Sequence, residues 1–197
     1  MLNEFRVGAS KADLVILNGT GTVYEIKSDR DSLARLMNQL DDYRKVFAKI
    51  YVIAGDAHIR EVMQRTPSEI GVMSLARWNR IQTIREAEDR PDLVDPLAIL
   101  DSLRSSEASL ILERLHLPKL DVPNTALRTV LKEIFAGLDP ATVHREMVAT
   151  LKQTRDLAPL NKLVANLPHS LQAAALSLQI RRGDHERVLS AVGTPLS

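Results

Sequence analysis

The sequence predicts an α/β fold in which a mixed sheet, flanked by helices, is followed by an all-helical C-terminal region. Three observations support this class. Short apolar runs alternate with helical patterns up to about residue 90, and their strand–helix–strand order implies that some strands pair in parallel. Strand signals then disappear after residues 89–96, DRPDLVDP. We therefore expect an α/β core over residues 1–90 and a helical region over residues 91–197.

The first expected elements are two strands joined in a hairpin. Residues 12–18, ADLVILN, form a short apolar run that ends next to Gly19. Residues 21–28, GTVYEIKS, follow at once and are rich in β-forming residues. The two runs should therefore pair as an antiparallel hairpin.

A helix should follow the hairpin, and either Asp29 or Asp31 can cap its N-terminus. Apolar residues recur there at helical spacing and would form one stripe, made of Leu33, Leu36, Met37, Leu40, Tyr43 and Phe47. Residues 49–55, KIYVIAG, then predict a buried strand.

The remaining elements follow from the same signals. Residues 57–67 predict a short helix that ends at Pro67, and residues 70–75 and 80–87 predict two further strands. In the C-terminal region, capping residues mark helix starts and glycines mark helix ends. The expected helices cover residues 104–117, 124–137, 139–156, 168–183 and 184–193.

Composition narrows the classes of protein that fit this chain. Apolar residues make up 45% of the 197 residues, as in a globular protein. The chain has no cysteine, which excludes disulfides and cysteine-ligated zinc and favours a reducing cytoplasm. We find no apolar run of about 18 residues that would predict a membrane span. The net charge of +1 disfavours a protein that coats nucleic acid, so positive charge at a nucleic-acid site would have to be local.

Glu25 and Lys27 are the first candidates for chemistry. Because side chains alternate along a strand, these two share one face of the sheet with Val23. An ion pair on a solvated face is one interpretation, and a metal site with its own lysine is the other.

The register of the hairpin decides between the two interpretations. A two-residue turn would put Asp13 and Glu25 on opposite faces of the sheet, because a slip of one residue reverses every side chain. A three-residue turn over residues 18–20 would instead pair Leu17 with Gly21 and place Asp13 opposite Glu25. We predict the three-residue turn, or a bulge with the same effect, since Gly19 and Gly21 both tolerate positive φ.

If the two carboxylates converge, they form a hard oxygen site together with the backbone carbonyl between Glu25 and Lys27. Such a site suits Mg²⁺ or Mn²⁺, which keep several waters and take one or two carboxylates plus substrate phosphate. A lysine beside the ion can position the attacking water and stabilise the developing charge. This chemistry is phosphodiester hydrolysis.

The pattern resembles that of the PD-(D/E)XK nuclease superfamily. Here it reads Ala12–Asp13, eleven residues, then Glu25–Ile26–Lys27, with alanine in place of the usual proline. The order of hairpin, helix and buried strand also resembles the nuclease core. The resemblance implies a restriction-endonuclease-like sheet and a metal-dependent nuclease acting on DNA. Asp13, Glu25 and Lys27 would be catalytic, with Asp13 and Glu25 as metal ligands.

The expected helix adds to this resemblance. Its Gln39 and Tyr43 are similar to the Gln-x-x-x-Tyr motif of RecB-type nucleases, and Arg35 lies on the same edge of the apolar stripe. Residues 4–54 resemble a family of small bacterial and phage members of the superfamily, in which Lys11 replaces an arginine. The resemblance implies that these four side chains support the site or contact the substrate backbone.

The N-terminus departs from the family pattern. Nucleases of this kind carry a helix before the hairpin with an acidic residue at its end, and Glu4 resembles that residue as a further metal ligand. Since only three residues precede Glu4, we expect that the first helix is either missing or present in a shortened form. The bare sheet surface would then be covered by a second subunit, a protein partner or the C-terminal helices.

Two other functions stay open at this point. One is a nuclease fold that no longer cuts and serves as a nucleic-acid- or protein-binding regulatory module. The other is a purely structural α/β protein, which requires the two-residue turn.

Overall fold

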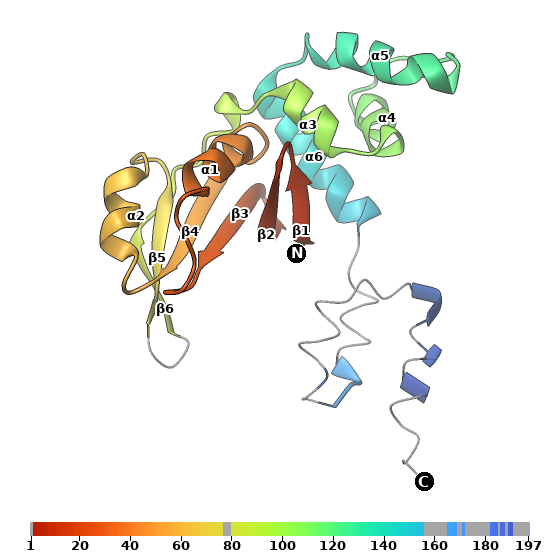
Figure 1. Cartoon of the computed structure of the whole chain (residues 1–197). Helices are drawn as coiled ribbons and strands as arrows, with labels where there is room; N and C mark the ends of the chain where they lie inside the picture. Colours follow the sequence, from red (N-terminus) through yellow and green to blue (C-terminus); the bar gives the residue numbers. More distant parts are fainter. Residues whose placement is uncertain are drawn as a thin grey trace. The chain divides into compact units, whose positions relative to one another are not determined.

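The strands form one six-stranded mixed sheet in the order β1-β2-β3-β4-β5-β6 (Figure 1). The computed structural model describes residues 2–76 and 80–155, and further on residues 165–168, 171, 182–184, 186–187 and 189–190. The strands are β1 (Leu2–Val7), β2 (Ser10–Asn18), β3 (Thr20–Lys27), β4 (Lys49–Gly55), β5 (Gly71–Ala76) and β6 (Arg80–Arg85). The predicted α/β class is confirmed.

The sheet is parallel in its centre and antiparallel at both ends. Strands β3, β4 and β5 pair in parallel, whereas β1 with β2, β2 with β3 and β5 with β6 pair antiparallel. Helices α1 (Leu36–Arg44) and α2 (Ile59–Arg65) supply the two crossovers between the parallel strands. The mixed sheet is as predicted.

The hairpin has the three-residue turn that the sequence predicts. Leu17 pairs with Gly21, and Gly19 at the tip has a φ of 74° that favours glycine. The same register pairs Leu14 with Tyr24. Extended by one residue, it sets Asp13 opposite Glu25 on one face of the sheet.

Helix α1 begins later than the sequence predicts, because both candidate capping residues bond elsewhere. Asp29 accepts a hydrogen bond from the backbone N–H of Ala57. Asp31 accepts two from Ser28, from its backbone N–H and from its hydroxyl, each at 2.7 Å. These bonds hold the pKa of Asp31 below its ordinary value. The chain between β3 and Leu36 is therefore a turn built on Asp31.

Strand β1 was missed by the sequence analysis. It alternates imperfectly, with Leu2, Phe5 and Val7 buried, and the φ of 54° at Glu4 interrupts its regular backbone. Strand β1 pairs with β2 at the edge of the sheet. It lies in the part of the chain, before the hairpin, where nucleases of this kind carry a helix.

Helices of the C-terminal region cover this end of the sheet. They are α3 (Pro96–Ser102), α4 (Ser105–Arg114), α5 (Asn124–Phe135) and α6 (Pro140–Thr154). Helix α3 packs on β1, and α6 packs on β2 and β3. The expectation that C-terminal helices cover the sheet is thus confirmed for one face. On the opposite face, Ile26 and Ile81 are 43% and 56% exposed. Coverage of that face by a second subunit therefore stays a prediction.

The helices α4, α5 and α6 confirm three of the five predicted C-terminal helices, whereas residues 168–183 and 184–193 lie largely outside the described residues. Helix α3 was not predicted, although Asp95 caps it and Pro96 occupies its first turn.

The chain divides into the compact units Met1–Thr154 and Arg155–Ser197. The predicted boundary at residue 90 thus falls between elements of one unit. The described residues contain no helix with the length and apolar character that crossing a membrane requires.

Gly21 allows α6 to approach the sheet closely. A Cβ at this position would lie 3.0 Å from His144 Nε2 and 3.2 Å from Phe47 Cδ1. His144 is 3% exposed, and its Nε2 has no hydrogen-bond partner in the described structure. The contact between α6 and β3 therefore buries a polar nitrogen, at a cost in stability.

This histidine should make the fold sensitive to acid. Burial lowers the pKa of His144 from its ordinary 6.5 to about 4, against the opposing effect of Asp89. Because the folded pKa lies below the unfolded one, stability is complete above pH 6.5 and falls as the pH decreases toward 4. Between pH 7 and pH 5, the free energy of unfolding measured in urea should fall by about 2 kcal/mol less in His144→Leu than in the wild type. The control is His116→Asn, which removes an exposed histidine instead of a buried one.

Gly71 lies where the structure leaves no room for a side chain. A Cβ there would overlap Cδ1 and Cε1 of the Tyr51 ring and lie 2.9 Å from the backbone nitrogen of Ala87. Tyr51 cannot move freely, since its ring stacks on Tyr24 with centroids 5.4 Å apart. We expect Gly71→Ala to lower the free energy of unfolding by about 1–3 kcal/mol in urea titrations. Gly137→Ala, whose Cβ would meet its nearest atom at 3.7 Å, should change it by much less.

Candidate active site

The predicted site residues gather where β2, β3 and α1 meet. An open pocket of about 490 Å³ lies between these elements. Six of the predicted residues line it, namely Lys11, Asp13, Glu25, Lys27, Arg35 and Gln39. The three-residue hairpin turn thus brings the carboxylates of β2 and β3 into one pocket with the lysine.

Glu25 and Lys27 form a buried ion pair. Lys27 Nζ lies 2.7 Å from Glu25 Oε1, and the two side chains are 10% and 2% exposed. A pair on a solvated face would be open to water, so that interpretation is wrong. Burial of two charges costs free energy unless other groups complete their hydrogen bonds.

Gln39 and Tyr43 on α1 complete these bonds. Gln39 Nε2 donates to Glu25 Oε1 at 2.7 Å, and Gln39 Oε1 accepts from Lys27 Nζ at 2.9 Å. The Tyr43 hydroxyl lies 2.7 Å from Glu25 Oε2. Residues four apart share one face of a helix, so α1 presents both side chains to β3. The predicted supporting role of this pair agrees with its position.

Tyr43 also ties the site to β2. Its hydroxyl lies 2.9 Å from the backbone carbonyl of Lys11 as well as beside Glu25. Burial, followed by the hydrogen bond with Glu25, raises the pKa of Tyr43 far above its ordinary value. The hydroxyl therefore keeps its proton and acts as a donor at any physiological pH.

Asp13 faces the pocket from β2. Its Oδ2 accepts a hydrogen bond from the backbone N–H of Ile26 at 2.8 Å. Unlike Glu25, Asp13 is exposed and can be reached by solvent. Among the described residues, no group of three or more His, Cys, Asp or Glu side chains is placed to hold a metal ion. Two carboxylates fit Mg²⁺ or Mn²⁺, which retain waters, better than an ion that needs a complete protein cage.

Glu4 does not join these residues. Its Oε1 lies 2.8 Å from Lys11 Nζ in an ion pair whose side chains are 59% and 53% exposed. Glu4 is not among the residues that line the pocket. The structure therefore gives the predicted third ligand a different partner, because the strand that carries Glu4 runs along the edge of the sheet.

Three polar residues of the pocket were missed by the sequence analysis. Asn38 lies next to Gln39 on α1 and is exposed. Ser10 donates its hydroxyl to Asp42 Oδ2 at 2.7 Å, which fastens the turn between β1 and β2 to α1. The spacing of Asn38 and Asp42 from Arg35, three and seven residues, could have placed them on its helix face. Ser10 carried no sequence signal.

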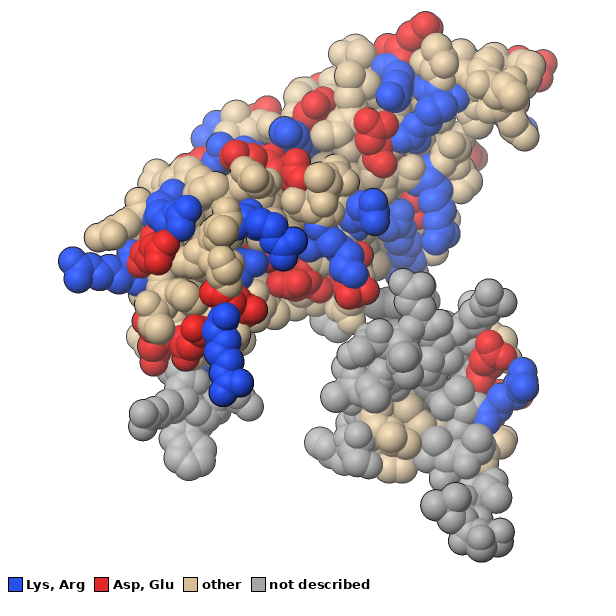
Figure 2. All heavy atoms as spheres, viewed as in Figure 1, with Lys and Arg blue, Asp and Glu red and all other residues tan. Residues whose placement is uncertain are grey.

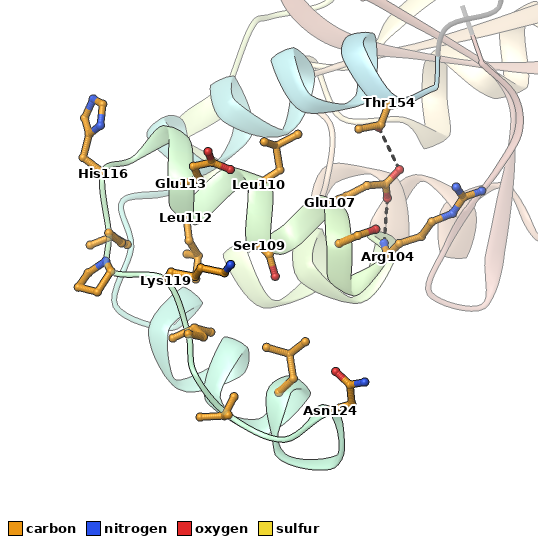
Figure 3. Close-up of a pocket in the computed structure, with 16 residues that line it drawn as sticks. Arg104, Glu107, Ser109, Leu110, Leu112, Glu113, His116, Lys119, Asn124 and Thr154 are labelled. Atoms are coloured by element: carbon orange, nitrogen blue, oxygen red, sulfur yellow. Dashed lines mark hydrogen bonds between the residues drawn. The ribbon is translucent and has the colours of Figure 1, made fainter.

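A larger cavity lies away from these residues. It has a volume of about 940 Å³ and lies between α4, α5 and their connection (Figure 3). Its buried carboxylate, Glu107, accepts a hydrogen bond from the backbone N–H of Arg104 at 2.8 Å and one from the Thr154 hydroxyl at 3.2 Å. Glu107 thus caps α4 and ties it to α6. The chemically richer pocket is the smaller one at β2 and β3.

Charges of both signs are mixed on the face of the molecule that Figure 2 shows. Figure 2 shows Lys and Arg side chains interspersed with Asp and Glu on the face in view, in agreement with the net charge of +1. Positive charge beside the pocket comes from Lys11 and Arg35. The positive charge at the pocket is therefore local.

The Tyr43 hydroxyl should contribute measurably to stability. We expect Tyr43→Phe to lower the free energy of unfolding by about 2 kcal/mol, because Glu25 and the Lys11 carbonyl lose a donor in a buried place. Tyr51→Phe is the matched control. Its hydroxyl bonds the exposed Glu86, where water can replace it, so urea titrations should show a smaller loss. Equal losses for the two variants would contradict the role given to Tyr43.

Comparisons with known proteins complete the description. The family model described as "Bacteriophage P4 protein cII" matches residues 1–163. Protein cII of Enterobacteria phage P4 is 39% identical over 81 residues, which are 40% of this chain and 31% of that protein. The match thus spans about a third of the length of the curated relative. A solved protein of unknown function from Silicibacter pomeroyi is 17% identical, covers 79% of this chain and 78% of its own, and has a TM-score of 0.35, too low to support an inference.

Proposed function

The chain belongs to the bacteriophage P4 protein cII family, and we propose that it is a metal-dependent nuclease that hydrolyses phosphodiester bonds of DNA. One observation carries the proposal. The hairpin register pairs Leu14 with Tyr24, one step before Asp13 and Glu25, and both carboxylates line one pocket with Lys27. A carboxylate pair can hold a divalent ion, and a lysine beside it supplies positive charge for metal-assisted hydrolysis of a phosphodiester.

In this proposal Asp13 and Glu25 hold Mg²⁺ or Mn²⁺. The bound ion would supply charge stabilisation at the scissile phosphate and a more acidic water. Lys27 orients the attacking water and stabilises the negative charge that develops on the phosphate. Gln39 and Tyr43 fix the position of Glu25 through the hydrogen bonds described above.

The pocket mouth supplies the contacts with substrate. Arg35 directly before α1, Asn38 on α1 and Lys11 on β2 line the pocket. Arginine and lysine side chains commonly bind backbone phosphates, and such contacts position a nucleic acid without reading its sequence. We therefore assign these three residues to phosphate binding.

The order of elements supports a restriction-endonuclease-like core. A hairpin carries the acidic residues, a helix follows, and the next strand pairs in parallel with β3. This is the order expected from the resemblance of Asp13 and Glu25–Ile26–Lys27 to the PD-(D/E)XK motif. The resemblance raises the expectation of nuclease chemistry but does not replace a test of the site.

A second candidate function is a nuclease-fold module that binds nucleic acid or protein without cutting. It is favoured by the ion pair of Glu4 with Lys11, which leaves two carboxylates for the metal. Such a module should bind DNA or a protein partner and show no cleavage under any divalent cation.

A cleavage assay tests the first candidate. The full chain is incubated with supercoiled plasmid or single-stranded DNA in Mg²⁺, Mn²⁺ or EDTA. We expect nicking or degradation that requires the metal and is lost in Asp13→Asn. Asp92→Asn, purified in the same way, is the control, because Asp92 pairs with Arg90 in a segment that does not line the pocket. Cleavage that persists in Asp13→Asn, or in EDTA, would contradict the proposal.

A further inference from the structure

We propose that Lys27 competes with the metal ion for Glu25, so that metal binding releases the lysine ammonium into the pocket. The inference rests on the proposed function and concerns the regulation of the same site. It follows from the hydrogen bonds that the chain itself makes to Glu25, and it gives Lys27 two positions rather than one.

The carboxylate of Glu25 is engaged on both oxygens. Lys27 Nζ and Gln39 Nε2 each donate to Oε1 at 2.7 Å, and the Tyr43 hydroxyl is bonded to Oε2 at 2.7 Å. An ionised carboxylate accepts about four hydrogen bonds in all. Three of these are filled from within the chain, and the Glu25 side chain is 2% exposed. A metal ion that binds Glu25 from solvent therefore finds the carboxylate already bound to the ammonium of Lys27.

Two cations cannot share this carboxylate without strong repulsion. A divalent ion bound to Oε1 or Oε2 would lie within a few ångströms of Lys27 Nζ, in a place where little water screens the charges. Of the three donors, Gln39 and Tyr43 are neutral and can remain. Lys27 is the donor that has to leave, because it is the one whose charge opposes the ion.

Lys27 is also the donor that can leave. It carries its ammonium on a flexible stem of four carbons, and it ends at the pocket wall with a side-chain exposure of 10%. Gln39 and Tyr43 are fixed on α1, and Tyr43 is fully buried. Rotation of the Lys27 side chain moves Nζ away from Glu25 and into the pocket.

Release would place Lys27 where a substrate phosphate binds. The pocket already receives positive charge from Lys11 and Arg35. A third cation would strengthen the attraction for a phosphodiester after, and not before, the metal is bound. By linkage, any ligand that holds Lys27 in the pocket must also tighten metal binding.

Metal affinity provides the first test. Mn²⁺ is titrated by calorimetry at pH 7.5 into the wild type and into Lys27→Met, which removes the charge at similar length. We expect Lys27→Met to bind Mn²⁺ at least tenfold more tightly, although it should not cleave DNA. Arg35→Met is the matched control, since it removes a cation from the same pocket without a contact to Glu25, and it should change the affinity by less than threefold.

Lysine labelling in the wild type provides the second test, which needs no variant of Lys27. Acetic anhydride labels exposed lysines, and the labelled sites are quantified by mass spectrometry with and without Mn²⁺. We expect labelling of Lys27 to rise at least threefold with Mn²⁺, while Lys11, which is already 53% exposed, changes little. The rise should disappear in Asp13→Asn.

The outcomes separate this inference from the proposed function. Equal Mn²⁺ affinity in wild type and Lys27→Met, with Lys27 labelling unaffected by the ion, would overturn the competition and leave a metal-dependent nuclease standing. Absence of Mn²⁺ binding in both proteins would overturn both. If Lys27→Met does not fold, as judged by circular dichroism, the labelling result alone decides.

Discussion

Lys27→Ala is expected to reduce metal-dependent cleavage of DNA by about a thousandfold. The loss of a single preorganised donor to a developing negative charge commonly costs 10²–10³ in rate, and the loss of a group that orients the nucleophile adds to it. The measurement is single-turnover cleavage of a labelled oligonucleotide in saturating Mg²⁺. Saturation matters because the variant should bind the metal more tightly, so the defect must appear in the chemical step.

Two controls accompany this prediction. The melting temperature of Lys27→Ala shows whether the fold is retained. Arg35→Ala, which removes a predicted phosphate contact but leaves Glu25 and its partners in place, should weaken DNA binding and have a smaller effect at saturating substrate. Cleavage by Lys27→Ala at the wild-type rate would refute the role given to Lys27.

Glu25→Ala is expected to have the largest effect on stability. It leaves the ammonium of Lys27, 10% exposed, without its carboxylate, and it removes an acceptor from Gln39 and Tyr43. Breaking a buried ion pair on one side costs roughly 3–5 kcal/mol. We expect a value of about 3 kcal/mol, near the lower end, because Lys27 can turn toward the pocket. Urea titration of the purified variant measures it.

A double variant shows whether this cost arises from the uncompensated charge. In Glu25→Ala/Lys27→Met the ammonium is absent, so much of the loss in the free energy of unfolding should be recovered. Additive losses from the two substitutions would contradict a direct coupling between Glu25 and Lys27. The same pair of measurements thus tests the ion pair independently of any enzymatic activity.

The hairpin register could be predicted because it depends on local backbone freedom. Gly19 adopts positive φ at the tip of the turn, and Leu17 pairs with Gly21 as the three-residue turn requires. From that register, the shared face of Asp13 and Glu25 follows by alternation alone. The part of the site that lies on two adjacent strands could therefore be predicted from the sequence.

The part of the site that depends on packing was only partly within reach. Helical spacing placed Gln39 and Tyr43 on one edge of α1, but their bonds to Glu25 depend on how the crossover seats α1 on the sheet. The start of α1 was predicted too early because Asp31 bonds Ser28 within its own turn, a competing use of the same side chain.

Strand β1 and the position of Glu4 could not be predicted. The strand has a weak alternating pattern and a residue in the left-handed region, and its pairing partner is known only once β2 is formed. The resemblance to nucleases suggested Glu4 as a metal ligand. Its ion pair with Lys11 instead follows from the pairing of β1 with β2, which sets these strands side by side.

A manganese soak tests the central claim most directly, because it asks whether Asp13 and Glu25 share one ion. A crystal of the full chain is soaked in Mn²⁺, and the anomalous difference density is calculated. The account predicts a peak in the pocket, bonded to both carboxylates, with Lys27 Nζ displaced from Glu25. A crystal in which Mn²⁺ binds elsewhere, while Lys27 stays on Glu25 and Asp13 contacts no ion, would contradict it.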